Sequence, residues 1–353
     1  MSSLGHIAIP RRYYACRHCR TKQTPWDLWA GITGSHRITP HARRMIVLAG
    51  SGCSFEEASR NLLELSHVKV ANDLVRAVCD EEGRSVQQWM NQSPEPAKAF
   101  AAAEGVVEFS TDGLTVNTVD GWREIRQSVI SRRMPGLRVP PDQWDDRTLD
   151  PPTVRLAMCA IARCDLIGAS WERLIRILGL PKDIEMSVIA DGAKWIWDQA
   201  ARRFKSPNVQ WVVDVYHVML YLFAAAGTME PKDAEQWVGK RVIELIEMGG
   251  PGFIEHLSST GPPDPSPQTG EAWAKLLNYL NDNRDSLWYG ERLAQGLPIG
   301  SGLIEGGGKN TLARRLKINS ARWRVRRAER MGAIRCLQYS GLWETYWDSK
   351  MAA

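Results

Sequence analysis

Between about residues 39 and 82, apolar positions recur with the spacing of an α-helix and predict three helices. The first is HARRMIVLAG, and the second is SFEEASRNLLEL, in which Ser54 is the N-cap and Glu57 completes a capping box. The third is VANDLVRAVCDEEG, whose apolar face consists of Val70, Leu74, Val75 and Val78. This spacing is typical of a helix-turn-helix, although three-helix clusters also occur in proteins that do not bind DNA. Residues 83–103 are polar and alanine-rich and predict a linker.

From residue 106 the pattern changes to the alternation of β-strands, in VVEFSTDGLTVNTVDGWREIRQSVI. The pair Asp120-Gly121 lies between two alternating runs and predicts a hairpin with a type I′ turn. The pair Asp112-Gly113 lies inside the first strand, with Val106, Val107 and Phe109 before it and Leu114 and Val116 after it. An acid inside a strand calls for a functional reason.

A proline-rich loop follows between about residues 134 and 153, and VRLAMCAIARCDLI then predicts a third strand that leads into a helix. Residues 181–204 and 209–227 each read as a buried strand, a sharp turn and a helix. Two such units after a hairpin-type start predict an α/β fold with a mixed, mainly parallel sheet. Residues 228–296 predict an all-helical insertion with a loop, GPPDPSPQTG, in its middle.

Composition narrows the class of protein. The chain has 353 residues, 44% of them hydrophobic and 24% charged, which is ordinary for a globular protein of two or three domains. The apolar run at residues 218–226 is too short to span a bilayer, and MSSLGHIAIPRRYY lacks the pattern of a signal peptide. Seven cysteines, an odd number, fit a reducing compartment. These features predict a soluble protein of the cytoplasm, associated with the nucleoid and with no membrane partner.

The net charge of +5 is unevenly distributed. Residues 309–335 contain ten cations and one acid, Glu329, so this segment carries +9 and the remainder of the chain −4. A solvated helix face usually interleaves acids and bases, whereas an uninterrupted basic segment suits the phosphates of double-stranded DNA. The predicted DNA-binding residues are Lys309, Arg314, Arg315, Lys317, Arg322, Arg324, Arg326 and Arg327, with Trp323 as a stacking or packing residue.

A single Cys-x-x-Cys motif, Cys16 and Cys19, lies near the N-terminus. A structural Zn²⁺ needs four ligands, and thus usually two such pairs. The motif therefore offers half a zinc site, and two free thiols are the favoured alternative.

Acids also lie at the ends of the predicted strands. Asp191 follows EMSVIA, Asp214 follows QWVV, and Asp112 lies on the first strand, while Glu305 stands in the glycine-dense LPIGSGLIEGGGKNTLARRLK. In an open α/β sheet, ligands gather at the carboxyl ends of strands. Carboxylates brought together there would repel one another without a cation, so they predict a site for Mg²⁺ or Mn²⁺. Two such ions support phosphoryl transfer.

Several short motifs follow one another along the chain: TDGLTV with GWREI, then VIADGAKWIW, then VVDVYH, and then GSGLIE followed by ARRLK and ARW. This ordered set resembles that of the DDE transposases of prokaryotic insertion sequences, in particular the ISKra family of the Mutator-like group. The resemblance implies an RNase H-like catalytic core with an all-α insertion, two Mg²⁺ or Mn²⁺ ions, and a homodimer or higher oligomer on transposon-end and target DNA. It implies that Asp112, Asp191 and Glu305 are the catalytic, metal-binding acids. Asp214 and His217 match a D-x-x-H element, in which Asp214 either supports catalysis or, as the pattern slightly favours, caps a helix.

This resemblance divides the chain into five predicted parts: a partial zinc-ribbon segment (1–24), a helix-turn-helix-like domain with linker (25–103), the first part of the core (104–227), the insertion (228–296), and the last part of the core with the basic helix (297–353). Two departures stand out. The earlier cysteine pair of the family's zinc ribbon is missing, and three glycines follow Glu305, so that either the helix begins near Lys309 or the backbone approaches DNA closely. A decayed, inactive element that only binds DNA as a regulator, or a nuclease that cuts without joining, are the alternative functions.

Overall fold

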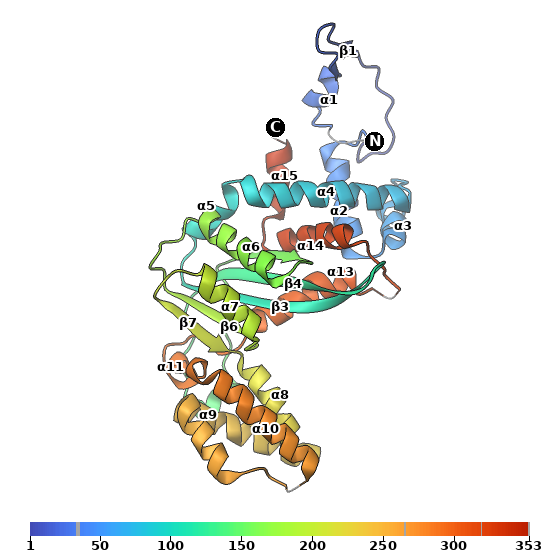
Figure 1. Cartoon of the computed structure of the whole chain (residues 1–353). Coiled ribbons are helices and arrows are strands. Elements are labelled where there is room, and N and C mark those ends of the chain that lie inside the picture. Colours follow the sequence, from blue (N-terminus) through green and yellow to red (C-terminus); the bar gives the residue numbers. More distant parts are fainter. Residues whose placement is uncertain (33–35, 265, 319, 352–353) are drawn as a thin grey trace.

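The computed structural model of the chain describes residues 1–32, 36–264, 266–318 and 320–351 (Figure 1). The strands are β1 (Tyr14–Ala15), β2 (Lys22–Gln23), β3 (Val106–Thr118), β4 (Gly121–Arg133), β5 (Val154–Ala160), β6 (Met186–Ala190) and β7 (Val209–Val213). The first helices are α1 (Pro25–Trp29), α2 (Pro40–Gly52), α3 (Phe55–Ser66), α4 (Asn72–Gln92), α5 (Glu95–Ala102), η1 (Pro141–Gln143), α6 (Cys164–Ile177), α7 (Lys194–Arg203) and α8 (Val215–Ala225). The remaining helices are α9 (Pro231–Thr260), α10 (Pro267–Asp282), η2 (Arg284–Ser286), α11 (Tyr289–Ala294), α12 (Gly302–Gly307), η3 (Gly308–Ala313), α13 (Arg314–Leu316), α14 (Val325–Tyr339) and α15 (Trp343–Met351).

The central sheet has the strand order β5-β4-β3-β6-β7. Strands β3, β4 and β5 pair antiparallel, and β6 and β7 join on the other side of β3 in parallel. The predicted mixed α/β sheet is therefore confirmed, but it is parallel in only half of its pairings. Helices α6 and α7 cover one face, where Phe109 of β3 packs edge-on against Trp171 and Phe204, while α14 packs along β5 on the other (Figure 1).

The β3–β4 hairpin forms as predicted, but its turn does not. The register pairs Thr118 with Gly121, so the loop between the strands is Val119–Asp120. A type I′ turn needs a positive φ at both central residues. In this turn only Gly121 has one, of 90°. Val119 resists a left-handed backbone because its side chain is β-branched, so the glycine alone takes that conformation.

Helices α2, α3 and α4 form the predicted cluster, and the side chain of Ser54 caps α3 by accepting the Glu57 amide at 3.1 Å. The predicted linker at 83–103 is wrong, because α4 continues to Gln92 and α5 follows almost at once. Burial explains the difference. Tight packing against α14 extends α4 beyond its predicted end, since a Cβ on Gly83 would lie 2.5 Å from the Arg330 carbonyl oxygen.

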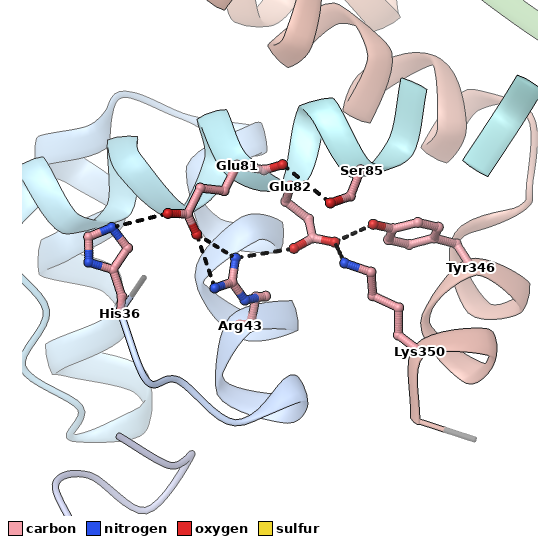
Figure 2. Close-up of polar contacts among 7 residues, drawn as sticks. All are labelled: His36, Arg43, Glu81, Glu82, Ser85, Tyr346 and Lys350. Carbon is pink, nitrogen blue, oxygen red and sulfur yellow. Dashed lines mark hydrogen bonds and ion pairs between the residues drawn. The ribbon is translucent and has the colours of Figure 1, made fainter. Parts of the chain in front are cut away.

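A buried polar network joins α4 to α2 and to the C-terminal helix α15 (Figure 2). Arg43 of α2 donates to Glu81 at 3.1 Å and to Glu82 at 3.3 Å. Glu82 is 1% exposed and also accepts hydrogen bonds from the Tyr346 hydroxyl and the Lys350 ammonium group. Glu82 therefore links its own helix, α4, to α2 and to α15 at the other end of the described chain.

The described residues of 228–296 are helical, as predicted, and form α9, α10, η2 and α11, which share a hydrophobic core with α8 and β7 (Figure 1). Arg292 of α11 attaches this insertion to the sheet. Its fully buried guanidinium donates to the Pro298 carbonyl at 2.7 Å and to the Ser187 hydroxyl of β6 at 3.1 Å. Among the helices that the structure describes, none is long and apolar enough to cross a membrane.

Candidate active site

Three aspartates continue one row across the neighbouring strands β3, β6 and β7. The parallel register pairs Ser110 of β3 with Ile189 of β6, and Ile189 with Val212 of β7. Two residues further along each strand stands an aspartate: Asp112, Asp191 and Asp214. Adjacent strands lie about 4.8 Å apart, so this register brings the carboxylates to one edge of the sheet.

Asp214 lies at the start of α8 and is fully buried. Its carboxylate accepts the Tyr216 amide at 2.8 Å and lies 3.4 Å from His217 Nδ1, and the Ser301 hydroxyl also donates to it. Burial alone would raise the pKa of Asp214, but the hydrogen bonds from these groups outweigh burial and lower it. The predicted helix-capping role of Asp214 is therefore confirmed.

Glu305 of α12 meets Asp214 and His217. Each of the three offers one ligand atom, and these atoms lie within 4.8 Å of one another. The hydrogen bond with Asp214 raises the pKa of His217, and the charges of Asp191 and Glu305 add to this effect. Partial burial raises the pKa of Glu305, and the charge of Asp214 raises it further. Carboxylate oxygens suit Mg²⁺ or Mn²⁺, and the imidazole also admits a softer ion such as Zn²⁺.

Asp112 and Asp191 border this cluster. Burial raises the pKa of Asp112, against the hydrogen bond from the Gly113 amide at 2.6 Å, and the charge of Asp191 contributes to the rise. Asp191 accepts the Ala193 amide at 2.9 Å, while the Tyr279 hydroxyl of the insertion donates to its backbone carbonyl at 2.7 Å. The charge of Asp112 also raises the pKa of Glu305, so the acids act on one another electrostatically.

The possible metal ligands that lie closest together differ from the predicted metal-binding set of Asp112, Asp191 and Glu305. Within the described part of the chain, the acidic and imidazole ligands that lie within 4.8 Å of one another are those of Asp214, His217 and Glu305, without Asp112 and Asp191. The sequence predicts only a supporting role for Asp214 and His217. The signal for their position was the D-x-x-H spacing, which puts both side chains at the first turn of a helix that directly follows a strand.

The glycines after Glu305 lie inside a helix that begins before them, at Gly302. Gly308 then opens a π-helix, η3, that runs to Ala313. Of the two alternatives for these glycines, a helix that begins near Lys309 is therefore wrong, and a close approach of the backbone to DNA stays a prediction. The close approach of α14 accounts for one of these glycines, because a Cβ on Gly307 would lie 3.0 Å from the Tyr339 hydroxyl. Single π-turns within helices are frequent at functional sites.

Arg335 of α14 holds the π-helix in place. Its guanidinium donates to the carbonyl oxygens of Asn310 at 2.8 Å and of Thr311 at 3.0 Å. These bonds satisfy backbone acceptors next to the helical turn that carries Glu305. The position of Glu305 thus depends on α14, and not only on its own short helix.

The predicted DNA-binding residues divide into exposed and buried groups. The exposed ones are Lys309, Arg314, Lys317, Arg322, Arg324 and Arg326, and Arg327 is half-buried. Arg315 is a correction to the predicted set, because it is 3% exposed and its guanidinium lies 4.6 Å from the Phe55 ring centre and 4.9 Å from that of Trp323. It also donates to the Gly50 carbonyl at 2.8 Å, so Arg315 joins the tail to α2. Trp323 is buried beside it and is a packing residue.

Cys16 and Cys19 occupy the turn between β1 and β2, where both are exposed. The Cys19 amide lies 3.5 Å from Cys16 Sγ, and hydrogen bonding with the Thr21 hydroxyl is the main cause that lowers the pKa of the Cys19 thiol to about 7. A lowered thiol pKa favours the thiolate, the form that binds metal. Where the structure describes the chain, no third metal ligand joins the pair, and zinc binding stays a prediction.

Comparison with known proteins adds no family assignment. A scan of the sequence against models of protein families finds no match, and no curated protein is significantly similar to it.

Proposed function

We propose that this chain is a DDE transposase, which cleaves and joins DNA strands at the ends of an insertion sequence through two divalent metal ions. The row of Asp112, Asp191 and Asp214 at one sheet edge, faced by Glu305, is the observation that carries this proposal. The sheet order β5-β4-β3-β6-β7, with its hairpin-type start and two parallel β-α units, supports an RNase H-like core. The helical insertion, placed between the second acid and Glu305, supports the Mutator-like group.

In this proposal Asp112, Asp191 and Glu305 hold the metal ions. When bound, two ions of this kind activate an attacking oxygen and stabilise the leaving oxygen of a phosphodiester. Asp214 orients His217 through the Nδ1 hydrogen bond, which leaves the imidazole facing Glu305 as a further ligand or proton carrier. The Tyr279 hydroxyl fixes the Asp191 backbone, so the insertion contributes to the shape of the site.

The deciding experiment is an assay with DNA that flanks the gene, incubated with the full chain and Mg²⁺ or Mn²⁺. Strand cleavage followed by joining to target DNA supports a transposase, and EDTA is expected to abolish both steps. Cleavage without joining would show a nuclease instead. Metal-independent DNA binding with no cleavage under any of these conditions would show a regulator and overturn the proposed activity.

Binding of metal predicts a stability change. At about 100 times its dissociation constant, Mn²⁺ is expected to stabilise the folded chain by about 2.7 kcal/mol, because it binds the assembled acids and not the unfolded chain. Differential scanning calorimetry with and without Mn²⁺ measures this. Glu305→Gln is expected to lose most of the shift, whereas Glu291→Gln, an exposed glutamate of α11, retains it. An equal shift in both variants would place the ion elsewhere.

The exposed cations of the tail predict the salt dependence of DNA binding. Replacing Arg314, Lys317 and Arg324 together by Ala is expected to weaken binding to all DNA sequences. Each lost phosphate contact also makes the negative slope of log K against log salt shallower by about 0.9. Fluorescence anisotropy at several salt concentrations provides the measurement.

A matched triple variant tests that the position of the charges matters. Lys232, Lys240 and Lys275 are exposed lysines of the insertion, and replacing them by Ala removes the same total charge. Their variant is expected to keep the wild-type slope. If both triple variants change the slope equally, the effect reflects net charge and not a phosphate-binding track.

A further inference from the structure

The β3–β4 hairpin extends well past the rest of the sheet (Figure 1). The ladder between β3 and β6 ends at the pair of Ser110 with Ile189, whereas the ladder between β3 and β4 continues to the pair of Thr118 with Gly121. The hairpin thus projects from the sheet edge that carries the acids, and the function proposed above leaves its tip without a role.

The hairpin tip is fastened to the basic tail. The Trp323 amide donates to the Asn117 carbonyl at 3.0 Å, and the Val119 amide donates to the Trp323 carbonyl at 2.8 Å. The Arg322 guanidinium donates to the Val119 carbonyl at 3.4 Å. These bonds add the tail as a short parallel partner beside the end of β3, which holds the tip in a defined position.

One face of this tip combines an exposed aromatic ring with positive charge. Trp122 is 67% exposed and pairs with Asn117 in the ladder, so it lies on the face opposite to that of Thr118. Trp323 pairs with Thr118 and is buried on the other face, and alternation along an extended segment therefore places Arg322 and Arg324 on the face of Trp122. Both arginines are exposed.

The acids near this face are Asp120 and Glu124. Glu124 is paired with Arg126, whose guanidinium also donates to the Ala162 carbonyl at 2.6 Å. Asp120 is exposed in the turn. The arginines of the adjoining tail outnumber these acids, because residues 322–327 contain four arginines and no acid.

We propose that Trp122 stacks on an unpaired nucleobase of the DNA substrate, while Arg322 and Arg324 hold the phosphates beside it. A flat, exposed indole on the same face as two exposed arginines matches the two parts of a nucleotide, the base and the phosphate. An apolar protein partner would match the indole but would leave both arginine charges to be desolvated without a counterion. This inference rests on the proposed action on DNA and adds a place where the duplex is opened.

The position of Trp122 on the hairpin sets the least distance between that base and the acids. Trp122 lies five residues before Gln127, the ladder partner of Asp112. At about 3.4 Å per residue this is roughly 17 Å along the hairpin. Because Asp112 and Thr118 are six residues apart on β3, Asp112 lies on the face opposite to Trp122, so the separation along the hairpin is the least distance between the stacked base and the acids.

The test uses the full chain, two DNA probes and three variants. The probes are a blunt duplex and a duplex of equal length whose last five base pairs are mismatched. Trp122→Ala is expected to bind the mismatched probe about tenfold or more weakly and the blunt duplex within about threefold of wild type, which corresponds to the loss of one stacked base. Trp122→Phe keeps most of the affinity. Trp29→Ala, the replacement of a tryptophan that is 82% exposed on α1, changes neither.

A fluorescent base locates the contact. With 2-aminopurine at successive positions of the mismatched probe, quenching by wild-type protein is expected to peak at one position and to disappear in Trp122→Ala. Wild-type affinity of Trp122→Ala for the mismatched probe, or an equal loss on both probes, overturns the proposal. The proposal is also overturned if sedimentation shows a dimer for the wild type and a monomer for Trp122→Ala, because Trp122 would then be a protein contact. In each of these outcomes wild-type cleavage persists, whereas failure of the proposed function removes cleavage from the wild type itself.

Discussion

Glu305→Gln is expected to lose metal-dependent DNA cleavage by roughly 10³-fold, because a carboxylate ligand that supports several kcal/mol of transition-state stabilisation is replaced by a neutral amide. The site makes this loss hard to compensate. The side chain reaches Asp214 and His217 from the short helix α12, whose Leu303 carbonyl accepts a hydrogen bond from the Tyr339 hydroxyl of α14, and a neutral amide there keeps the shape but not the charge. Single-turnover cleavage of labelled DNA measures the effect.

The same variant is expected to bind DNA within about threefold of wild type, since the exposed cations of the tail are unchanged. Asp112→Asn and Asp191→Asn are expected to lose cleavage to a similar extent. Glu291→Gln, a matched change on the exposed surface of α11, is expected to leave cleavage within about twofold. Cleavage that persists in all three acid variants would show that the row of acids is not the catalytic centre.

The sheet and its acids could be predicted because their signals are local. Period-2 alternation marks β3 on both sides of Asp112, and short apolar runs that end in an aspartate mark β6 and β7. Parallel strands present their carboxyl ends at one edge, which brought Asp191 and Asp214 together, and the acid inside the adjacent first strand, Asp112, marked the third position. The register that puts them in one row confirms that step of the reasoning.

The features of the candidate site that could not be predicted depend on contacts between segments far apart in the chain. Arg315 looks like its exposed neighbours in the sequence, and only the approach of Phe55 and Trp323 buries it. Gly307 reads as a helix breaker until Tyr339 of α14 is placed beside it. The grouping of Glu305 with Asp214 and His217 likewise follows from where α12 lies against α8, for which the local sequence has no periodic signal.

The charges at the centre of the polar network predict a sharp contrast in stability between two adjacent glutamates (Figure 2). Glu82→Ala is expected to lower the free energy of unfolding by about 3–5 kcal/mol, because it removes the partner of a buried charge. Arg43, which is 4% exposed, would lose the bond to Glu82, and the Tyr346 hydroxyl and Lys350 would lose their common acceptor. Urea unfolding followed by circular dichroism measures the change.

Glu81→Ala is the matched control, since Glu81 occupies the next position on α4 and also pairs with Arg43. Its side chain is 30% exposed, so water can replace much of what is lost, and the expected cost is roughly 1 kcal/mol or less. Glu82 differs because its partners come from both α2 and α15, so its removal weakens the contacts of α4 with both of these helices. Equal losses in the two variants would mean that water reaches the Glu82 site and that hydrophobic contacts alone hold α15 in place.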